Sequence, residues 1–547
     1  MTTLAYLQPG QHDQFHHVIV GGGTAGCILA ARLAEALPDR RILVIEAGPS
    51  DFMDGRVLDL RRWLSLLGSE LDYDYPTTEQ LMGNSYIRHS RAKVLGGCSS
   101  HNTLISFRPF EYDLQLWESM GATGWSFATM MRVLDKLRCT VQPVHARHRN
   151  QLCRDWVQAC ADAYSMPIHD NFNAEIAQTG YLGASTGFFS VSYNPDDGYR
   201  SSASVAYIHP ILRGEEPRPN LVILAEAWVS KINLGSDGAV SSIDMQLKDG
   251  SRHAVSALVE TVLCAGAIDT PRLMLLSGMG PLKQLSSLNI PVVCDIPGVG
   301  ENLMDHPEAV IIWGFSRPVP PNQTTMDSDV GIFLRREAPN DAAARGPTPT
   351  TPKALPDGEI ADVMMHCYQI PFTYNTARLG YPEPDDGFAF CMTLNIPRPR
   401  SRGRLYLVSA DPAVHPALGF RYFTDEEGYD AATLVYGIKA ARKVAEQEPF
   451  KAWIKREVAP GPLVRSDEGI SEYARRAAHT VYHPAGTMRM GDVEKDALVV
   501  VDPTLRVRRV KKLRVCDASV FPTIPSINPM LTVMGVAERL AEMEALA

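Results

Sequence analysis

The sequence lacks the features that mark several classes of protein. Its ten cysteines are scattered and form no CxxC pair, the spacing typical of zinc sites and dithiol redox sites. No metal site is therefore predicted, and most thiols are expected to be buried in a reducing compartment. No apolar run is long enough to cross a bilayer, and the first fifteen residues have no secretory apolar core. These absences favour a cytoplasmic protein that does not enter a membrane.

A basic excess is also lacking. The chain has 53 Lys and Arg against 62 Asp and Glu, a net charge of −9. Nucleic acids and anionic membranes both require a basic face, so neither is expected as a partner. Internal repeats are absent too. Because 547 residues exceed what one simple core holds, two or more domains are predicted.

What the sequence does contain is a glycine cluster near its start. In order, there are an apolar run at 18–20, then Gly21, Gly23 and Gly26, a helix-like stretch at 27–33, and a second apolar run, 42–45, that ends in Glu46. This is the order of a dinucleotide site: strand, glycine turn, helix, and a strand ending in an acid. Glu46 can accept hydrogen bonds from both ribose hydroxyls and would repel the phosphate of NADP, which leaves FAD and NAD.

Each glycine of this cluster has a physical reason. Gly21 permits the tight turn, Gly23 lets the backbone approach a pyrophosphate, and Gly26 lets helix and strand pack closely. Thr24 and Ala25 lie where the helix begins, and a helix N-terminus attracts phosphate charge.

Two further motifs place a histidine next to glycines. In 96–102, Gly96 and Gly97 let the backbone lie against a flat ring, and the polar residues that follow, His101 among them, offer hydrogen bonds. In 481–491, His483 lies between aromatic, proline and glycine residues. An imidazole suits a general base because its unperturbed pKa lies near working pH. Taken alone, either histidine also fits a structural role.

Two more motifs contain acids and an amide. Asp305 to Glu308 follow the turn 297–300, and Asp517 begins an ending that includes Asn528-Pro529. In isolation, a solvated acidic loop and an ordinary Asn-Pro turn explain them equally well. None of these motifs decides the chemistry alone.

Two apolar runs further along the chain, 221–224 and 259–264, are predicted to be strands. The second run leads into a helix that is predicted to begin at Pro271, with Asp269 or Thr270 as its cap. This pattern predicts another strand, turn and helix of the dinucleotide sheet.

Together these motifs resemble the GMC (glucose-methanol-choline) family of flavoprotein oxidoreductases, and most specifically its choline-oxidising members. The family's order is followed by the glycine fingerprint, 96–100, 266–271, 483–487 and 517–519, and the subgroup's segments by 92–102, 207–211, 305–308, 364–366 and 480–484. The resemblance covers nearly the whole chain.

The resemblance implies an α/β fold in two discontinuous parts. A Rossmann-like FAD-binding domain is expected from 1–160, 204–310 and 470–547. An α+β substrate domain, an antiparallel sheet flanked by helices, is expected from 161–203 and 311–469. A homodimer is carried over from the same resemblance.

The family implies FAD rather than NAD. His101 matches the histidine to which choline-oxidising members bond the 8α-methyl of the isoalloxazine, so covalent FAD is expected. Asn102 is expected at the flavin edge, and Val229 and Asp517 at the adenine and phosphate ends. The cofactor-binding residues that the resemblance implies are Gly21, Gly23, Thr24, Ala25, Gly26, Glu46, Ala47, Leu95, Gly96, Gly97, Ser100, His101, Asn102, Val229, Asp517, Ala518, Asn528 and Pro529.

The resemblance also implies a chemistry, the oxidation of a primary alcohol to the aldehyde, with further oxidation to the acid left open. His483 matches the family's active-site histidine and is expected to accept the alcohol proton or stabilise the alkoxide. Asn528 and His366 are expected to hydrogen-bond the same oxygen, while flavin N5 takes the hydride and O2 reoxidises the flavin to give H2O2. A dehydrogenase that reduces a quinone, a flavin-dependent lyase and a non-catalytic flavin protein remain as alternatives.

Substrate choice is expected to rest on Glu308, which matches a carboxylate that pairs with a trimethylammonium group inside an aromatic cage. The other substrate contacts that the resemblance implies are Trp63, Tyr482, Thr103 and Phe372. The chain departs from the family pattern at 326–330, where Met-Asp-Ser-Asp-Val replaces a tryptophan pair, and in a longer loop at 337–358. A missing aromatic wall and added acids predict that a primary amine or larger amino alcohol, amino sugars included, fits better than a quaternary ammonium.

Overall fold

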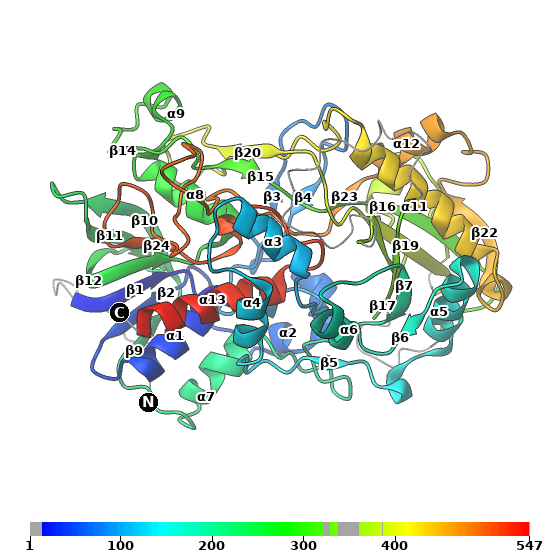
Figure 1. Ribbon diagram of the computed structural model, residues 1–547, viewed down its shortest axis with the longest axis horizontal. Helices are drawn as coiled ribbons and strands as arrows, with labels where there is room; N and C mark the ends of the chain where they lie inside the picture. Colours follow the sequence, from blue (N-terminus) through cyan, green and yellow to red (C-terminus); the bar gives the residue numbers. More distant parts are fainter. Residues whose placement is uncertain (1–13, 321–328, 337–359, 386, 546–547) are drawn as a thin grey trace.

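The computed structural model describes residues 14–320, 329–336, 360–385 and 387–545. Two large sheets lie at opposite ends of the molecule in Figure 1, and helices surround both. The chain passes between these two parts several times, as the resemblance implies. The predicted boundary at 310 falls inside one continuous strand of the second sheet, Pro307–Phe315, and the exact division into domains stays a prediction.

The first sheet is built on the dinucleotide motif. Within the described residues it has the order β10 (Ala227–Leu234), β11 (Val240–Leu247), β12 (Arg252–Leu263), β1 (Gln14–Val20), β2 (Ile42–Ile45) and β9 (Leu221–Leu224), with β24 (Leu513–Val515) beside β12. The pairs among β9, β2, β1, β12 and β24 are parallel, and β10 to β12 are antiparallel. All four residues of β2 are buried, as expected for a parallel strand covered on both faces. The predicted strands 42–45, 221–224 and 259–264 are confirmed, the last as the end of a longer strand.

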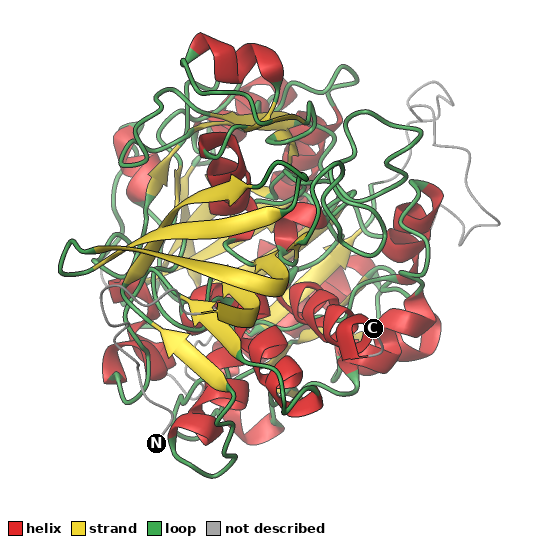
Figure 2. Ribbon diagram, turned by 90° about the vertical axis from the view of Figure 1, so that its left-hand side faces the viewer, coloured by secondary structure: helices red, strands yellow, loops and turns green. Residues whose placement is uncertain are grey.

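Helices cover both faces of this sheet. Figure 2 shows them with the end of the molecule that contains the sheet turned toward the viewer. α1 (Thr24–Ala36) packs beside α13 (Met530–Ala545), so the first and last helices of the chain are neighbours (Figure 1). α4 (Phe127–Leu134) in turn packs on α13. The two ends of the chain are thereby joined into one layer.

The second sheet is almost entirely antiparallel. In the described part of the chain its order is β22 (Ile454–Ala459), β16 (Pro307–Phe315), β19 (Ala389–Asn395), β18 (Val363–Tyr368), β17 (Val330–Leu334), β7 (Ser185–Phe188) and β6 (Ile168–His169), with β23 (His479–Thr480) also paired to β16. Among the described strands of this sheet, only β6 and β7 pair in parallel. α5 (Gln151–Tyr164) and α11 (Tyr429–Ala445) pack on one face of this sheet, which leaves the other face toward the first part of the molecule. The expected helix-flanked antiparallel sheet is confirmed.

One predicted helix start was wrong. α8 runs from Gly266 to Leu276 and contains Pro271 in its interior, five residues after its first residue. Proline has no N–H for the carbonyl of Ala267 four residues earlier, and that carbonyl instead accepts a hydrogen bond of 2.7 Å from the Thr487 hydroxyl. A partner 220 residues away therefore lets the helix continue through the proline. Asp269 does not cap the helix but accepts from the Tyr75 hydroxyl at 2.7 Å.

Candidate active site

A cavity of about 990 Å³ is lined by the carboxyl ends of the first sheet and by one face of the second. Most of the predicted site residues lie in its wall. These are Gly21, Gly23, Thr24, Ala25, Glu46, Ala47, Gly97, His101, Asn102, Val229, Asp517, Ala518, Asn528 and Pro529 for the cofactor, and Trp63, Thr103, Glu308, His366, Phe372, Tyr482 and His483 for the substrate and chemistry. The fold thus brings both predicted groups into one space.

Four predicted cofactor residues, Gly26, Leu95, Gly96 and Ser100, are not among the lining residues. A Cβ on Gly26 would lie 1.9 Å from the carbonyl oxygen of Gly21, and one on Gly96, whose φ is +87°, would lie 2.0 Å from the Ser100 hydroxyl. Ser100 donates to the buried Asp51 at 3.1 Å, and Leu95 is buried in the core. In the structure these four residues lie outside the cavity wall and support the two glycine loops by packing.

The two glycine loops touch at the start of α1. Gly21 has φ +102°, and a Cβ there would lie 2.5 Å from a backbone carbonyl oxygen. A Cβ on Gly97 would lie 2.6 Å from the Cα of Gly23. Thr24 joins the loops by accepting from the N–H of Ser99 at 3.1 Å. No side chain caps α1, so its first N–H groups are available to an anion in the cavity.

Glu46 lies at the end of β2, as the fingerprint requires. Its carboxylate accepts from the N–H of Gly22 at 2.9 Å and from the N–H of Gly48 at 2.8 Å. Burial raises the pKa of Glu46 to about 7, and these hydrogen bonds act in the opposite direction. A carboxylate has about four lone-pair positions, so it can still accept from ribose hydroxyls.

Asp517 lines the cavity, but its carboxylate is already bonded. It accepts from the N–H of Gly266 at 2.9 Å, from the Thr270 hydroxyl at 2.6 Å and from the N–H of Ser519 at 2.8 Å. It therefore fixes the first turn of α8 and the turn after β24. Thr270, one of the two predicted caps, contributes to this turn by donating its hydroxyl hydrogen bond to Asp517.

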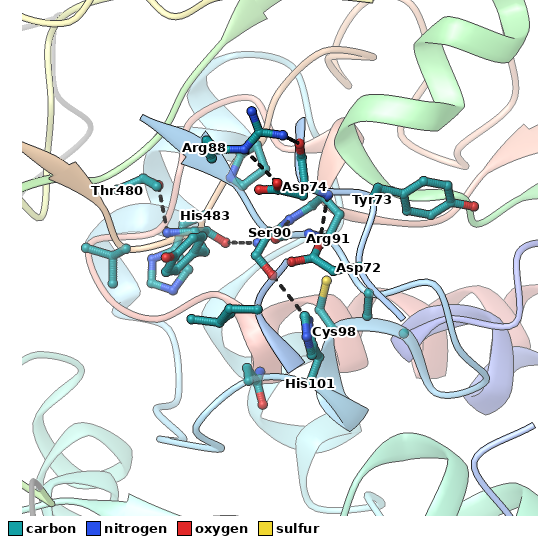
Figure 3. A pocket seen from close by; sticks show the side chains of 18 of the residues that line it. Asp72, Tyr73, Asp74, Arg88, Ser90, Arg91, Cys98, His101, Thr480 and His483 are labelled. Atoms are coloured by element: carbon teal, nitrogen blue, oxygen red, sulfur yellow. Dashed lines mark hydrogen bonds and ion pairs between the residues drawn. The ribbon is translucent and has the colours of Figure 1, made fainter. Parts of the chain in front are cut away.

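His101 is 5% exposed and follows the 3-10 turn Gly97–Ser100. Its Nδ1 lies 3.3 Å from the Ser90 hydroxyl (Figure 3), whereas Nε2 is buried without a hydrogen-bond partner of ordinary geometry. Burial lowers the pKa of His101 to about 4, so the ring is neutral at pH 7. The guanidinium of the buried Arg200 donates to the carbonyl oxygens of His101 and Asn102, which holds this loop.

His483 lines the same pocket (Figure 3) and bonds a second histidine. Its Nδ1 lies 2.9 Å from Nδ1 of His306, and Nε2 of His306 lies 3.0 Å from the carbonyl oxygen of Pro397. Because a carbonyl oxygen only accepts, Nε2 of His306 carries the proton and its Nδ1 has the lone pair. Nδ1 of His483 must then be the donor, which leaves Nε2 of His483 as an unprotonated base. Burial lowers the pKa of His483 well below its ordinary value, and so does His306.

The backbone before His483 is held in an uncommon conformation. Tyr482 has φ +62°, its N–H donates to the Thr480 hydroxyl at 2.7 Å, and its carbonyl accepts from Arg91 at 2.5 Å. The N–H of His483 donates to Asp305 at 2.9 Å. Burial raises the pKa of Asp305 to about 6. Asp305 thus fixes the backbone of His483 from the motif that precedes Glu308.

The second sheet contributes one row of side chains to the cavity. Val310 pairs with Thr393, and Thr393 pairs with His366. Because directly opposed residues and every second residue of a strand share a face, Glu308 and Tyr368 lie on that face too. All five residues line the cavity.

His366 has unused hydrogen-bonding capacity. Both of its ring nitrogens are buried without a partner among the described residues. Burial lowers the pKa of His366 to about 3, so the neutral ring offers one donor and one acceptor.

Glu308 lines the same cavity as several aromatic rings. Trp63 and Phe372 meet edge to face at 6.4 Å between centroids, and Phe372 meets Tyr368 at 4.8 Å. Burial raises the pKa of Glu308 to about 8, against a hydrogen bond with Thr393 that lowers it. A half-buried acid whose ionised form has no ion-pair partner among the described residues is a candidate site for a cation.

Sequence reasoning missed Tyr368 and His306. Tyr368 supplies an aromatic wall, and its signal was the spacing 364, 366, 368 along a strand. Of the segment 326–330, residues 326–328 lie outside the described residues, as does the loop 337–358. Asp329 is not in the cavity wall and accepts from the Tyr193 hydroxyl at 2.7 Å, so this predicted acid does not face the substrate space.

Comparison with known proteins identifies the family of this chain. Two models described as GMC oxidoreductase match residues 15–308 and 399–537. The chain belongs to the GMC oxidoreductase family. Choline oxidase of Arthrobacter globiformis is 39% identical over 97% of this chain and 94% of that protein. An acceptor-dependent alcohol dehydrogenase of Pseudomonas putida is 30% identical over 97% and 95%.

Solved structures agree with this family. Pyridoxine 4-oxidase from Mesorbium loti superposes with a TM-score of 0.85 at 26% identity, over 97% of this chain and 99% of that one. GMC enzymes use FAD, and this chain is accordingly an FAD-dependent oxidoreductase that acts on CH–OH donors. Among the described residues, no helix has the length and apolar character of a membrane span, and no cluster of three or more His, Cys, Asp or Glu side chains is arranged for a metal.

Proposed function

We propose that this GMC enzyme oxidises a primary alcohol that carries a positive charge, choline or another amino alcohol, to the aldehyde. The observation that carries the proposal is that an unprotonated imidazole nitrogen, Nε2 of His483, and a half-buried carboxyl group, that of Glu308, line one cavity. The first suits the alcohol proton and the second the cationic end of the same small molecule.

The residues present fit FAD. The uncapped start of α1 suits the pyrophosphate, Glu46 the ribose, and the orphaned Nε2 of His101 a covalent bond to the flavin. When bound, FAD supplies the hydride acceptor. The protein's own task is to bind and orient the alcohol, to hold water out and to take the hydroxyl proton.

We assign the acceptance of the alcohol's hydroxyl proton to His483. Its Nε2 lone pair accepts the hydroxyl proton, and His306 keeps that lone pair on the correct nitrogen. His366 and Asn528 both line the cavity, and each can donate one hydrogen bond to the oxygen as negative charge develops on it. Such donors act strongly because the site is buried.

The electron acceptor is proposed to be O2, with H2O2 as the second product. A dehydrogenase that reduces a quinone is the alternative, because acceptor-dependent alcohol dehydrogenase is also among the relatives. A flavin-dependent lyase is the alternative from another class.

The test is a screen of alcohols scored by loss of the flavin absorbance without air. Choline and amino alcohols are expected to bleach the flavin, and neutral alcohols of equal size to bleach it more slowly. Air should restore the colour with one H2O2 per aldehyde. Bleaching that only dyes or quinones reverse would identify the dehydrogenase, and no bleaching by any alcohol would exclude the proposed oxidation.

A second prediction concerns the flavin bond. His101→Asn is expected to leave FAD bound but not attached, so that acid-precipitated wild-type protein is yellow and the variant's pellet is colourless. The exposed His145 gives a matched control, since His145→Asn should keep the yellow pellet. A colourless wild-type pellet would show that Nε2 of His101 does not form the bond.

A further inference from the structure

His479 is a cavity residue to which neither the motifs nor the family comparison gives a role. It lies in β23 and is paired directly with Glu308 of β16. Residues directly opposed in an antiparallel pair have Cβ atoms about 4.5–5.5 Å apart and share a face. Both residues line the cavity, so the imidazole and the carboxyl group border the same space.

The hydrogen bonds of His479 determine which of its nitrogens is free. Nδ1 lies 2.8 Å from the carbonyl oxygen of Thr480. A carbonyl only accepts, so Nδ1 carries the proton. Burial lowers the pKa of His479, so the ring is neutral at pH 7 and Nε2 carries a lone pair. Nε2 forms no hydrogen bond with any residue in the described part of the chain.

The two acceptors do not satisfy each other. No nitrogen of His479 lies within ion-pair distance of Glu308, although both residues are described. The Tyr482 ring packs edge to face on His479 at 5.3 Å between centroids. When Glu308 is ionised, its carboxylate and the imidazole lone pair of His479 therefore lie on neighbouring strands with no hydrogen bond between them.

We infer that Glu308 and His479 together bind a protonated amine that keeps at least one N–H, so that the enzyme prefers primary to tertiary amino alcohols over quaternary ones. The inference rests on the proposed function and makes its substrate class narrower. His479 is a specificity residue in it, because it accepts the N–H hydrogen bond while Glu308 supplies the counter-charge.

The physical reason is the difference between N–H and C–H. A trimethylammonium group presents only methyl groups, so Nε2 of His479 would be covered without a donor. A buried acceptor left without its partner weakens binding, and sites built around a hydrogen bond discriminate strongly against ligands that lack it. Aromatic rings alone would instead favour the extra methyl, by about fourfold per buried carbon.

The test compares two inert ligands that differ in one group. N,N-dimethylethylammonium has one N–H, ethyltrimethylammonium has a methyl in its place, and neither has a hydroxyl to oxidise. Their dissociation constants are measured by calorimetry on the FAD-loaded enzyme at pH 8.5, above the pKa of about 8 of Glu308, so that its carboxyl group is mostly ionised. We expect the tertiary ammonium to bind about tenfold more tightly, about 1.4 kcal/mol. His479→Leu should reduce this ratio to about one or reverse it. His479→Gln, which retains an acceptor oxygen, should keep a preference for the N–H.

The outcomes separate the two proposals. Equal or tighter binding of the quaternary ligand by the wild type overturns the inference and leaves the cation site standing. A tertiary preference that survives in His479→Leu overturns the role of His479. If neither ammonium binds, the proposed cation site itself fails. If His479→Leu does not fold, the ratio of the two dissociation constants in the wild type and in His479→Gln still tests the inference.

Discussion

His483→Ala is expected to lower the rate of anaerobic flavin reduction by an alcohol about 10²–10⁴-fold, the usual contribution of a positioned general base. The reason is that Nε2 of His483 carries the lone pair fixed by the bond between His483 and His306. The measurement is stopped-flow absorbance with saturating substrate, so that the loss appears in the limiting rate. Flavin content and the absorbance spectrum verify that the site is intact.

His306 provides the matched test of this assignment. His306→Leu removes the acceptor for Nδ1–H of His483 and should lower the same rate by a smaller factor, with the substrate dissociation constant little changed. His306→Gln keeps an acceptor and should recover part of the loss. A His483→Ala enzyme that reduces its flavin as fast as wild type would show that the proton leaves by another route.

Above pH 8, where Glu308 is ionised, Glu308→Gln is expected to lower kcat/KM for a cationic alcohol about 30- to 150-fold, a loss of about 2–3 kcal/mol, because the carboxylate is the counter-charge. Neutral alcohols of the same shape should lose little. Glu383 gives a matched control, since it lines the same cavity but is exposed, and Glu383→Gln should change kcat/KM by a small factor only. Equal losses for charged and neutral alcohols would contradict the assignment.

The pH dependence of kcat/KM provides an independent measurement of the same carboxylate. Burial raises the pKa of Glu308 to about 8, so the anion that binds a cation is complete only above that pH. With choline, whose charge does not titrate, kcat/KM should fall about tenfold per unit as the pH drops below 8. The profile should be flat there for 3,3-dimethylbutan-1-ol and in Glu308→Gln.

The contiguous motifs could be predicted well from the sequence. The turn at Gly21 to Gly26 and the acid at Glu46 form one local unit, strand, turn, helix and strand, and its order allows few alternatives. The helix at Pro271 shows the limit of such reasoning. Local rules put its start at the proline, and the carbonyl that the proline leaves unpaired found a donor at Thr487 instead.

The predictions for the substrate-binding residues depended on the family resemblance, and the structure changed the reasons behind them. The preference for amines that carry N–H was expected from added acids, one of which, Asp329, proves to bond Tyr193 away from the cavity. The reason for that preference now lies in His479. The prediction of a missing aromatic wall at 326–330 is not tested, because residues 326–328 lie outside the described residues, but Tyr368, which the sequence did not single out, adds an aromatic ring to the cavity wall.

By itself, then, the sequence indicated a dinucleotide fold, the family, and a set of site residues most of which line one cavity, because these are properties of short segments and their order. Only the tertiary structure decided which nitrogen of His483 is the base and what faces Glu308. His306 and His483 are 177 residues apart, and His479 meets Glu308 only because β23 pairs with β16. Such contacts depend on which distant segments pair in a sheet, and the spacing of residues within each segment did not show that β23 pairs with β16.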